Sequence, residues 1–440
     1  MKIIFKNFRI VDDATDSMGK VIAEDGIITN AENDTPLQGK PGDDEKGAAL
    51  IIDGAGFSTA DVPILMPAFV DLHAHFRDPG FPDKENLESA SLSAAAGGFG
   101  TVVCMANTMP VIDSLEKVLE LKARSDRLSL VDLHPVMTLS KGMEGTELSG
   151  IKNLLPQTGG IKNGEGPYIP LMLSEDGKDV ADDDLFLAAM KEAKRIGIPV
   201  SCHCDLDGEE NAVRRAIELG KKAGCHIHIA HVSTKGAIEI IRKAKADLKN
   251  ESPEDNSGSG FILTCEVMPH NLCLTKEDAK KLGEGSFGRV NPPLRSEEDR
   301  KALILAIADG TIDAVATDHA PHSRSDKEKG SPGFSGFETA FAAFYTELIR
   351  PSPPVIDLKK LSSLMSCEPA KLLGFESGSQ KRGRILPGWR ADLVIVDPGF
   401  KWIVESEKFK TKGKNSPFAG RELFGGICMT IHRGKVVYEK

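Results

Sequence analysis

The sequence lacks the long apolar segments that membrane proteins need. No run of about 18 apolar residues occurs in it, so we expect no membrane span. Residues 1–12 carry Lys2, Lys6 and Arg9 and have no unbroken apolar core of the kind found in signal peptides. These two absences predict a cytoplasmic protein with no membrane partner.

The sequence also lacks paired cysteines and an excess of positive charge. None of its eight cysteines belongs to a CxxC pair, which argues against a zinc finger or a dithiol redox site. Cysteines such as Cys104 lie within apolar stretches, as reduced core residues do. The formal net charge is −10, which disfavours nucleic acid as a partner because its binders are usually basic. A small anionic substrate remains compatible, since the charge inside a pocket decides its binding.

Short apolar segments alternate with helical patterns through the middle of the chain. We expect strands at Phe69–His73, Thr101–Met105, Leu130–Met137, Ile169–Leu173, Ile198–His203, His226–Ala230, Phe261–Glu266 and Asp313–Thr317. Helical patterns separate many of them, at Leu87–Ala96, Leu115–Ala123, Asp183–Arg195, Asn211–Lys222 and Glu297–Ala308. This rhythm predicts an α/β fold, a TIM-like (β/α)8 barrel. Such a barrel uses about 250 residues, which leaves room for a smaller domain.

Both ends of the chain have the pattern of β structure. Lys2–Val11 is largely apolar, and Asp25-Gly26 is a hairpin turn signal between two short strands. Near the other end, Ala391–Asp397 has the pattern of a strand, and Arg433-Gly434 joins two more. We expect these strands to form a small β-sandwich. The predicted domains are residues 1–64 and 381–440, which share the sandwich, and residues 65–380, which form the barrel.

Histidine and aspartate residues stand at the ends of the predicted strands. His73 and His75 lie two residues apart, and this spacing puts both imidazoles on one face of the first strand. Four more residues follow the fourth, fifth, sixth and eighth strands: Asp176, His203, His231 and Asp318. Because active sites of such barrels are built at the carboxyl ends of the strands, we expect all six side chains to converge on one rim.

Such a set of ligands predicts two divalent ions. Imidazole and carboxylate together suit zinc, manganese or a similar ion. Six side chains are too many for one tetrahedral zinc with an open position, so one carboxylate is expected to bridge two ions. Two ions about 3.5–4 Å apart can share a hydroxide and polarise a substrate carbonyl. A single histidine would more often be structural, and a single aspartate after a strand is usually a helix cap. Six of them at successive strand ends favour the metal site.

Four motifs resemble those of the class I dihydroorotases in the amidohydrolase superfamily, and the resemblance covers nearly the whole chain. His73–Gly80 is similar to the metal-binding signature that carries the substrate arginine. Asn107–Pro110 looks like the second signature, whose asparagine binds substrate. Asn291–Arg295 is similar to the segment that lines the pyrimidine ring. Thr317–His322 looks like the signature with the catalytic aspartate and a substrate-binding histidine.

The resemblance implies a role for each matching residue. It places the first ion on His73, His75 and Asp318, the second on His203 and His231, and the bridge on Asp176, with zinc as the expected metal. It makes Asp318 the catalytic acid and base. The implied substrate-binding residues are Arg77, Asn107, Asn291, His322 and Gly333. Gly333 comes from a segment that is one residue shorter here than in the family, and Glu175 replaces the family's first Asp of an Asp-Asp-Gly segment.

Some relatives bridge the ions with a carboxylated lysine. The nearest candidate here is Lys162, but its Gly-rich, polar surroundings are those of a surface loop, and we expect Asp176 to bridge.

The implied activity agrees with the chemistry of these side chains. The family cyclises N-carbamoyl-L-aspartate reversibly to L-dihydroorotate in de novo pyrimidine biosynthesis, with a hydroxide held by both ions. An arginine such as Arg77 is a natural carboxylate clamp because its fork is planar and bidentate. Asn107 and Asn291 can both donate and accept hydrogen bonds, which suits an amide ring.

Three other functions compete with this one. Allantoinases and dihydropyrimidinases share the barrel and the metal site, but allantoinases carry another residue at the position of Arg77. Dihydropyrimidinases usually depend on a carboxylated lysine in a motif that is absent here. Some dihydroorotase-like chains have lost their ligands and serve only as partners of aspartate transcarbamoylase, whereas all the ligand positions are intact here. A homodimer and an association with aspartate transcarbamoylase both stay open.

Overall fold

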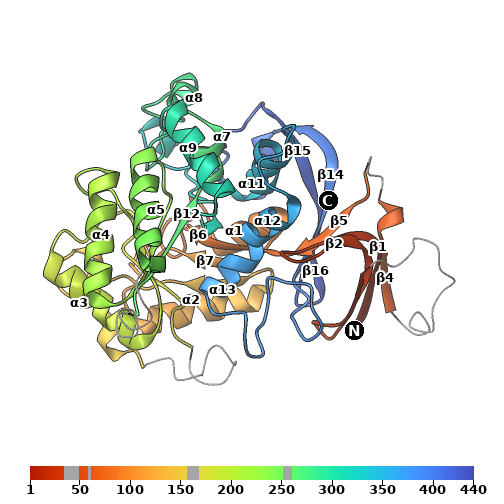
Figure 1. The fold of residues 1–440 in the computed structure, drawn as a ribbon, viewed down its shortest axis with the longest axis horizontal. Coiled ribbons are helices and arrows are strands. Elements are labelled where there is room, and N and C mark those ends of the chain that lie inside the picture. The colour runs from red at the N-terminus through yellow and green to blue at the C-terminus, as the bar shows by residue number, and fades with distance from the viewer. Residues whose placement is uncertain (34–48, 58–60, 156–167, 251–259) are drawn as a thin grey trace.

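The computed structural model describes residues 1–33, 49–57, 61–155, 168–250 and 260–440 (Figure 1). An α/β part occupies one side of the molecule. Strands from both ends of the chain form a β part on the other side, where both termini lie. No helix within these ranges is long and apolar enough to span a membrane.

Parallel strands form the wall of the α/β part. They fall into two hydrogen-bonded groups, in the orders β6-β7-β8 and β13-β12-β11-β10-β9. Isolated parallel bridges connect the groups, Ala74 with His319 and Met137 with Leu173, and so close the ring. This architecture confirms the predicted TIM-like barrel. The strands are β6 (Phe69–Ala74), β7 (Phe99–Cys104), β8 (Asp132–Pro135), β9 (Leu173–Ser174), β10 (Val200–Cys202), β11 (His226–Ile229), β12 (Ile262–Val267) and β13 (Ala314–Val315).

The fourth barrel strand begins later and is shorter than the sequence predicts. We expected it at 169–173, and β9 consists of Leu173–Ser174 alone. Pro170 lies in the predicted stretch and has no N–H to donate to a neighbouring strand. The ladder therefore begins at Leu173, whose N–H bonds to the carbonyl of Pro199 at 3.0 Å.

The helices begin and end where capping residues stand. The observed α1 and α9 coincide with the predicted ranges, and each starts with a capping box, at Asn86 and Ser296. Glycines in the left-handed conformation end α3 and α4, at Gly197 and Gly224. The helices are α1 (Leu87–Ala96), α2 (Leu115–Leu128), α3 (Asp183–Ile196), α4 (Glu209–Ala223), α5 (Lys235–Asn250), α7 (Pro269–Cys273), α8 (Lys276–Leu282), α9 (Glu297–Ala308), α10 (Arg324–Glu328), α11 (Phe337–Phe344), α12 (Leu358–Ser362) and α13 (Glu368–Leu372).

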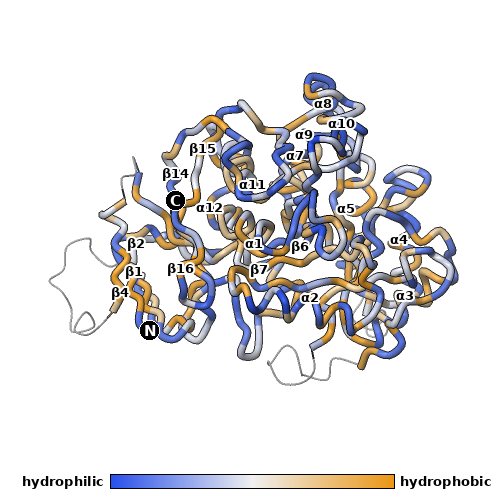
Figure 2. The backbone as a smooth tube through the Cα atoms, turned by 180° about the vertical axis from the view of Figure 1, so that it is seen from behind, coloured by the Kyte–Doolittle hydropathy of each residue, from blue (hydrophilic) through white to orange (hydrophobic). Residues whose placement is uncertain are grey.

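The terminal strands form one continuous hydrogen-bonded sheet in the order β16-β15-β14-β5-β1-β2-β3, and β4 pairs with β1. The N-terminal and C-terminal strands enclose a common apolar cluster that includes Phe5, Phe8, Leu393 and Ile431. Two layers of strands around a shared core are what the predicted sandwich requires. Figure 2 shows the hydrophobic colour running along β1 in this part and along β7 in the barrel. The strands are β1 (Lys2–Val11), β2 (Asp16–Glu24), β3 (Ile27–Asn33), β4 (Ala49–Asp53), β5 (Ile64–Pro67), β14 (Leu393–Ile403), β15 (Glu422–His432) and β16 (Lys435–Glu439).

The division into residues 1–64, 65–380 and 381–440 stays a prediction. The shared sheet and the separate barrel ring support it. Strand β5 (Ile64–Pro67) straddles the first boundary, since it pairs with β1 and β14 and leads directly into β6.

A buried ionic cluster joins the amino-terminal end of the barrel to the segment before β14. Asp132, at the start of β8, is 3% exposed and accepts from Arg382 at 2.5 Å and Arg390 at 2.8 Å. Arg382 also donates to Thr101 of β7 at 2.9 Å. Burial opposes the charge on Asp132, but the nearby cations outweigh it and hold the pKa of this carboxyl well below its ordinary value of 3.8. The cluster is therefore fully charged at neutral pH.

We expect Asp132→Asn to lower the free energy of unfolding by about 3–5 kcal/mol at pH 7, because it leaves two buried guanidinium groups without their counter-charge. Since the pKa of Asp132 is depressed in the folded state, its contribution is complete above pH ~4 and is lost as the pH falls below that value. Urea unfolding at several pH values measures both effects.

Asp126→Asn is the matched control. Asp126 pairs with Lys122, which also contacts Asp132, but its side chain is 49% exposed. A change within about 0.5 kcal/mol is expected there. Equal losses in the two variants would show that burial does not strengthen the Asp132 cluster.

Candidate metal centre

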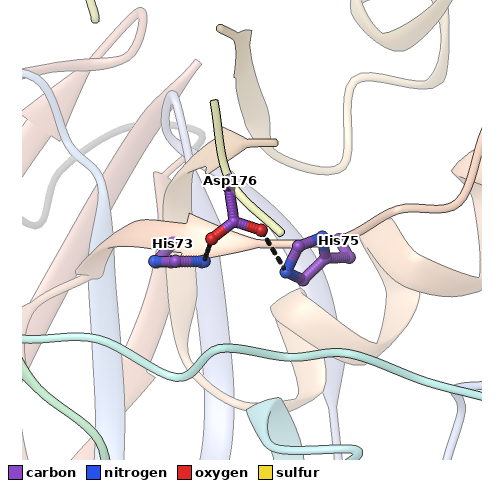
Figure 3. A group of neighbouring side chains, drawn as sticks. All are labelled: His73, His75 and Asp176. Atoms are coloured by element: carbon purple, nitrogen blue, oxygen red, sulfur yellow. Dashed lines mark ion pairs between the residues drawn. The ribbon is translucent and has the colours of Figure 1, made fainter. Parts of the chain in front are cut away.

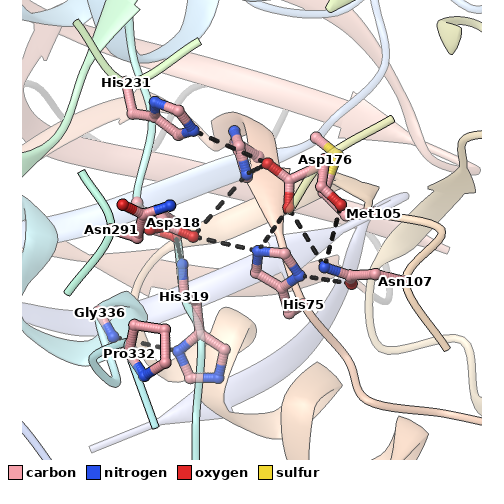
Figure 4. Close-up of polar contacts among 12 residues, drawn as sticks. His75, Met105, Asn107, Asp176, His231, Asn291, Asp318, His319, Pro332 and Gly336 are labelled. Carbon is pink, nitrogen blue, oxygen red and sulfur yellow. Dashed lines mark hydrogen bonds and ion pairs between the residues drawn. The ribbon is translucent and has the colours of Figure 1, made fainter. Parts of the chain in front are cut away.

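The six predicted ligand residues lie at the carboxyl ends of the barrel strands. His73 and His75 come from the end of β6, and His203 follows β10 directly. Asp176, His231 and Asp318 follow β9, β11 and β13 within three residues. Figure 4 shows side chains from these separate strands pointing toward a common centre. The structure therefore brings together all the residues that the strand-end pattern singled out.

Asp176 is shared by two groups of side chains that could each hold a metal ion. One group is Asp176 with His73 and His75, and the other is Asp176 with His203 and His231. Asp176 Oδ1 lies 3.1 Å from His73 Nε2, and Asp176 Oδ2 lies 3.4 Å from His75 Nε2 (Figure 3). On the other side, Oδ1 lies 3.4 Å from His203 Nδ1 and 3.8 Å from His231 Nε2. A carboxylate in this position is suited to bridging two ions.

Asp318 approaches the first group from the end of β13, the strand that neighbours β6 where the ring closes. Its Oδ1 lies 3.1 Å from His75 Nε2 and 3.8 Å from His73 Nε2. The side chain is 6% exposed and also faces the pocket described below. One carboxylate can thus contact both an ion and a substrate.

Glu266 and Asn107 orient the two histidines of β6. Glu266, fully buried on β12, lies with Oε1 3.1 Å from His73 Nδ1. Asn107 Oδ1 lies 2.9 Å from His75 Nδ1. An Nδ1–H that donates to either oxygen leaves the Nε2 lone pair free for a metal, which is the usual support for a ligating histidine. Glu266 ends a predicted strand, but no local pattern marked it as part of the site, and the family resemblance gave Asn107 only a role in substrate binding.

The charges around the centre suit a cation. Burial would lower the pKa of His73, but neighbouring carboxylates raise it well above its ordinary value. Burial would raise the pKa of Asp318, but the hydrogen bond from His75 and the nearby imidazoles lower it to about 2. His73 Nε2 is buried and faces Asp176 Oδ1 at 3.1 Å and Asp318 Oδ1 at 3.8 Å. A buried nitrogen aimed at two carboxylates fits a metal ion, which would occupy its lone pair.

Three residues of the site have backbone conformations that side chains rarely adopt. The φ angles are 36° at His231, 44° at Asp318 and 56° at Arg77. Residues outside glycine in this left-handed region carry strain, and such strain gathers at functional sites where the surroundings enforce it. Here it turns the chain sharply after a strand, so that each side chain points inward over the rim.

A cavity of about 190 Å³ opens over the candidate ligands. Its walls include every residue predicted to bind substrate: Arg77, Asn107, Asn291, His322 and Gly333. This volume is smaller than that of pockets for drug-sized ligands and suits a single small ring. Gly333 has φ 139°, and a Cβ there would lie 2.5 Å from the carbonyl oxygen of Ala320, so only glycine fits at this point of the wall.

Arg77 gives the pocket a positive end. Its guanidinium donates to the carbonyl of Pro321 at 3.3 Å and lies 3.3 Å from His322 Nε2, and no carboxylate among the described residues pairs with it. His322 is neutral, since burial and the charge of Arg77 lower its pKa to about 3. The guanidinium is therefore available to an anionic group in the pocket.

The remaining histidines near the barrel axis do not face the pocket. His228 Nε2 lies 3.2 Å from Glu266 Oε2, below the metal centre. His319 stacks on Phe337 with ring centroids 4.2 Å apart and pairs with Glu85. His270 packs against Phe334. These three histidines pack around the site and do not line its cavity. The alternative bridging residue, Lys162, lies outside the described residues.

A larger cavity of about 520 Å³ lies between α11 and the C-terminal strands. Aromatic side chains such as Phe341, Phe400 and Trp402 dominate its walls. None of the histidines discussed above lines it. We therefore identify the candidate site by its chemistry and not by its size.

The sequence pattern of the amidohydrolase family matches residues 64–437. The chain belongs to the amidohydrolase family, which is metal-dependent, and the two histidine and aspartate groups agree with that property.

Relatives place the chain with the dihydroorotases of that family. A dihydroorotase of Clostridium botulinum (strain Eklund 17B / Type B) is 37% identical over 449 residues and covers 100% of both chains. A dihydroorotase of Thermoanaerobacter sp. (strain X514) is 34% identical and covers 100% of this chain and 98% of its own.

Solved structures confirm the fold. An L-hydantoinase (dihydropyrimidinase) from Arthrobacter aurescens matches with a TM-score of 0.81 and 25% identity over 100% of this chain and 96% of its own. A dihydropyrimidinase from Brevibacillus agri NCHU1002 matches with a TM-score of 0.78 and 20% identity over 100% and 95% of the two chains.

We expect Glu266→Gln to lower zinc affinity by about 10–100-fold, because the variant loses the charge that orients His73 and raises its basicity as a ligand. Competition with a chromogenic chelator measures the change. Glu338→Gln is the control and should bind zinc normally, because Glu338 is a half-buried glutamate that accepts from Lys410 and Ser93 away from the centre. Unchanged affinity in Glu266→Gln would rule out this supporting role.

Proposed function

We propose that the chain is a dihydroorotase that cyclises N-carbamoyl-L-aspartate reversibly to L-dihydroorotate in pyrimidine biosynthesis. The observation that carries the proposal is the placement of Arg77 in the same cavity as the shared carboxylate of Asp176. One end of the cavity suits cations that activate an amide, and the other suits a carboxylate. Dihydroorotate carries a ring amide and an exocyclic carboxylate.

We propose that the site holds two divalent ions, zinc in the first instance. His73, His75 and Asp318 would hold one, His203 and His231 the other, and Asp176 would bridge them. Bound ions of this kind lower the pKa of a water molecule and polarise a substrate carbonyl. The fit rests on the two ligand groups that share Asp176 and on the buried Nε2 of His73, which faces the carboxylates of Asp176 and Asp318.

Arg77 would bind the exocyclic carboxylate through its planar fork. His322 lies beside the guanidinium and, being neutral, adds a hydrogen-bonding group without further charge. Asn291 and Gly333 line the same cavity and would contact the ring. Asn107 would serve the substrate and the metal centre together, since its amide already contacts His75 and Asp176.

Asp318 would move the proton. In hydrolysis, water attacks the ring carbonyl carbon and the ring C–N bond breaks. Asp318 takes up a proton from the attacking water and delivers it to the departing nitrogen. In ring closure the same proton travels the other way. The low pKa of Asp318 leaves it ionised and ready to accept a proton in the hydrolytic direction.

The chief alternative is a hydantoinase or dihydropyrimidinase activity, because the similar solved structures are a hydantoinase and a dihydropyrimidinase. Hydantoin and dihydrouracil lack the exocyclic carboxylate, so Arg77 would have no counter-charge in those complexes. A guanidinium in the pocket that has no carboxylate partner among the described residues favours dihydroorotate. A cytoplasmic location and a homodimer or an association with aspartate transcarbamoylase remain predictions.

The test of this proposal is the rate on dihydroorotate, dihydrouracil and allantoin, measured side by side. We expect the purified chain to prefer dihydroorotate. Arg77→Ala should lower its kcat/KM on dihydroorotate by about two to three decades, because losing a charged, desolvated partner costs about 2–5 kcal/mol. Any residual rate of the chain on dihydrouracil should be nearly the same in Arg77→Ala and in the wild type.

Arg124→Ala is the control for Arg77→Ala. Arg124 pairs with Asp78, the residue after Arg77, but does not line the cavity. Equal losses on dihydroorotate and dihydrouracil in Arg77→Ala would mean that Arg77 maintains the site and does not select the substrate.

Asp318→Asn should retain at least one ion and lose nearly all turnover in both directions. The amide can still coordinate weakly, but it cannot take up and release a proton. Metal analysis and steady-state rates on the same sample measure the two effects. A near-normal rate with metal bound would assign the acid–base role to another group, with His322 as the next candidate.

A further inference from the structure

Lys327 is a fully buried lysine close to the substrate cavity. It lies in α10, five residues after His322, and its exposed fraction is 0%. Buried ammonium groups are normally paired with carboxylates. No carboxylate among the described residues forms an ion pair with Lys327, and the cavity walls do not include it. Burying an ammonium without a carboxylate partner costs free energy, so the placement of Lys327 requires an explanation.

The ammonium donates to backbone carbonyls instead. Nζ lies 2.8 Å from the oxygen of Arg289, 2.7 Å from that of Ser331 and 2.9 Å from that of Gly333. An ammonium has three N–H donors, so these carbonyls use all of them. Burial lowers the pKa of Lys327 to about 8, which leaves it mostly charged at neutral pH.

These carbonyls belong to the segments that carry the predicted substrate contacts. Arg289 lies two residues before Asn291, and Ser331 lies two residues before Gly333. The helix of Lys327 itself begins at Arg324, two residues after His322. One ammonium therefore connects the three segments that bring Asn291, His322 and Gly333 to the cavity.

Neighbouring bonds show that these segments meet at one point. The N–H of Gly333 donates to the carbonyl of Arg289 at 3.0 Å. His322 Nε2 lies 2.8 Å from the carbonyl oxygen of Pro332. Asn415 reaches the carbonyl of Gly333 from the other side at 3.2 Å. Lys327 supplies the charged contacts in this junction, and charge-assisted hydrogen bonds are roughly twice as strong as neutral ones.

We propose that Lys327 is a positioning residue for substrate binding: it holds the segments of Asn291, His322 and Gly333 in register around the substrate without touching it. This inference rests on the proposed function for its kinetic test, though not for its structural one. The segments of Asn291 and Gly333 supply no predicted metal ligand, and Asp318 lies four residues before His322, outside the contacts of Lys327. Their displacement should therefore weaken binding of substrate and transition state alike, which raises KM more than it lowers kcat.

The decisive variant is Lys327→Met, which keeps the length and the apolar stem and removes all three donors. We expect KM for dihydroorotate to rise by about tenfold or more, because each lost bond to a charged donor is worth about one to two decades in isolation. We expect kcat to fall by less than about threefold and the zinc content to stay unchanged. Lys327→Gln, which keeps two donors, should show a smaller rise in KM and protects the test against misfolding of the first variant.

Lys245→Met is the matched control. Lys245 donates to the carbonyl of Thr311 at 2.7 Å and to Asp313 at 2.5 Å, at the amino-terminal end of β13 and away from the cavity. This variant should lose stability and keep both KM and kcat. A KM for Lys327→Met no higher than that of Lys245→Met would overturn the proposal, as would parallel loss of kcat and metal.

Amide hydrogen exchange provides a readout that needs no substrate. In Lys327→Met the amides of Gly333 and Ser335, both hydrogen-bonded in the folded protein, should exchange faster than in the wild type. Peptides that carry His73 and His203 should be unaffected. If the amides of Gly333 and Ser335 exchange no faster in Lys327→Met than in the wild type, the positioning role is overturned even if KM rises. If the wild type does not turn over dihydroorotate, the proposed function fails, and the exchange result alone decides the role of Lys327.

Discussion

Closure of the barrel between β6 and β13 is the constraint on which the rest of the site depends. Asp71 of β6 accepts from the backbone N–H and the hydroxyl of Thr317, at 3.0 and 2.5 Å, and the N–H of His75 donates to the carbonyl of His319 at 2.8 Å. These contacts bring His75 against Asp318, although 243 residues separate them in the chain. Because both strands also bond to their other neighbours, the ring has no free edge at which the centre could open.

Charge is layered along the barrel axis above this closure. Inside the ring, Glu266 lies between His228 and His73 and compensates their buried imidazoles. Asp176 and Asp318 form the next layer, among histidines that could hold metal ions. Arg77 forms the outermost layer and faces the cavity, and no carboxylate in the described part of the chain pairs with it. Each layer is stable in a buried setting only with a partner of opposite sign, and for the upper two layers the proposed partners are metal and substrate.

The amino-terminal end of the barrel carries contacts that stabilise the fold, and the carboxyl end carries the candidate site. At the amino-terminal end, Asp132 joins β8 to Arg382 and Arg390 and so fastens the barrel to the terminal strands. At the carboxyl end, two of the predicted ligand residues, His231 and Asp318, have strained backbone conformations. Strain of this kind persists only on a rigid support, which the opposite end and the shared sandwich core provide.

The sequence by itself determined the barrel and the convergence of the six predicted ligand residues on one rim, because both depend on local patterns. Alternating apolar segments mark the strands, a spacing of two puts His73 and His75 on one face, and the carboxyl ends of all barrel strands share a rim. The early part of the predicted fourth strand was wrong because Pro170 cannot join the ladder. Only the tertiary structure revealed the support of His73 by Glu266, the double contact of Asn107 and the junction at Lys327. These contacts join segments that are distant in the chain, and no spacing along one strand or helix encodes them. They exist because closing the ring places the ends of separate strands within hydrogen-bonding distance of one another.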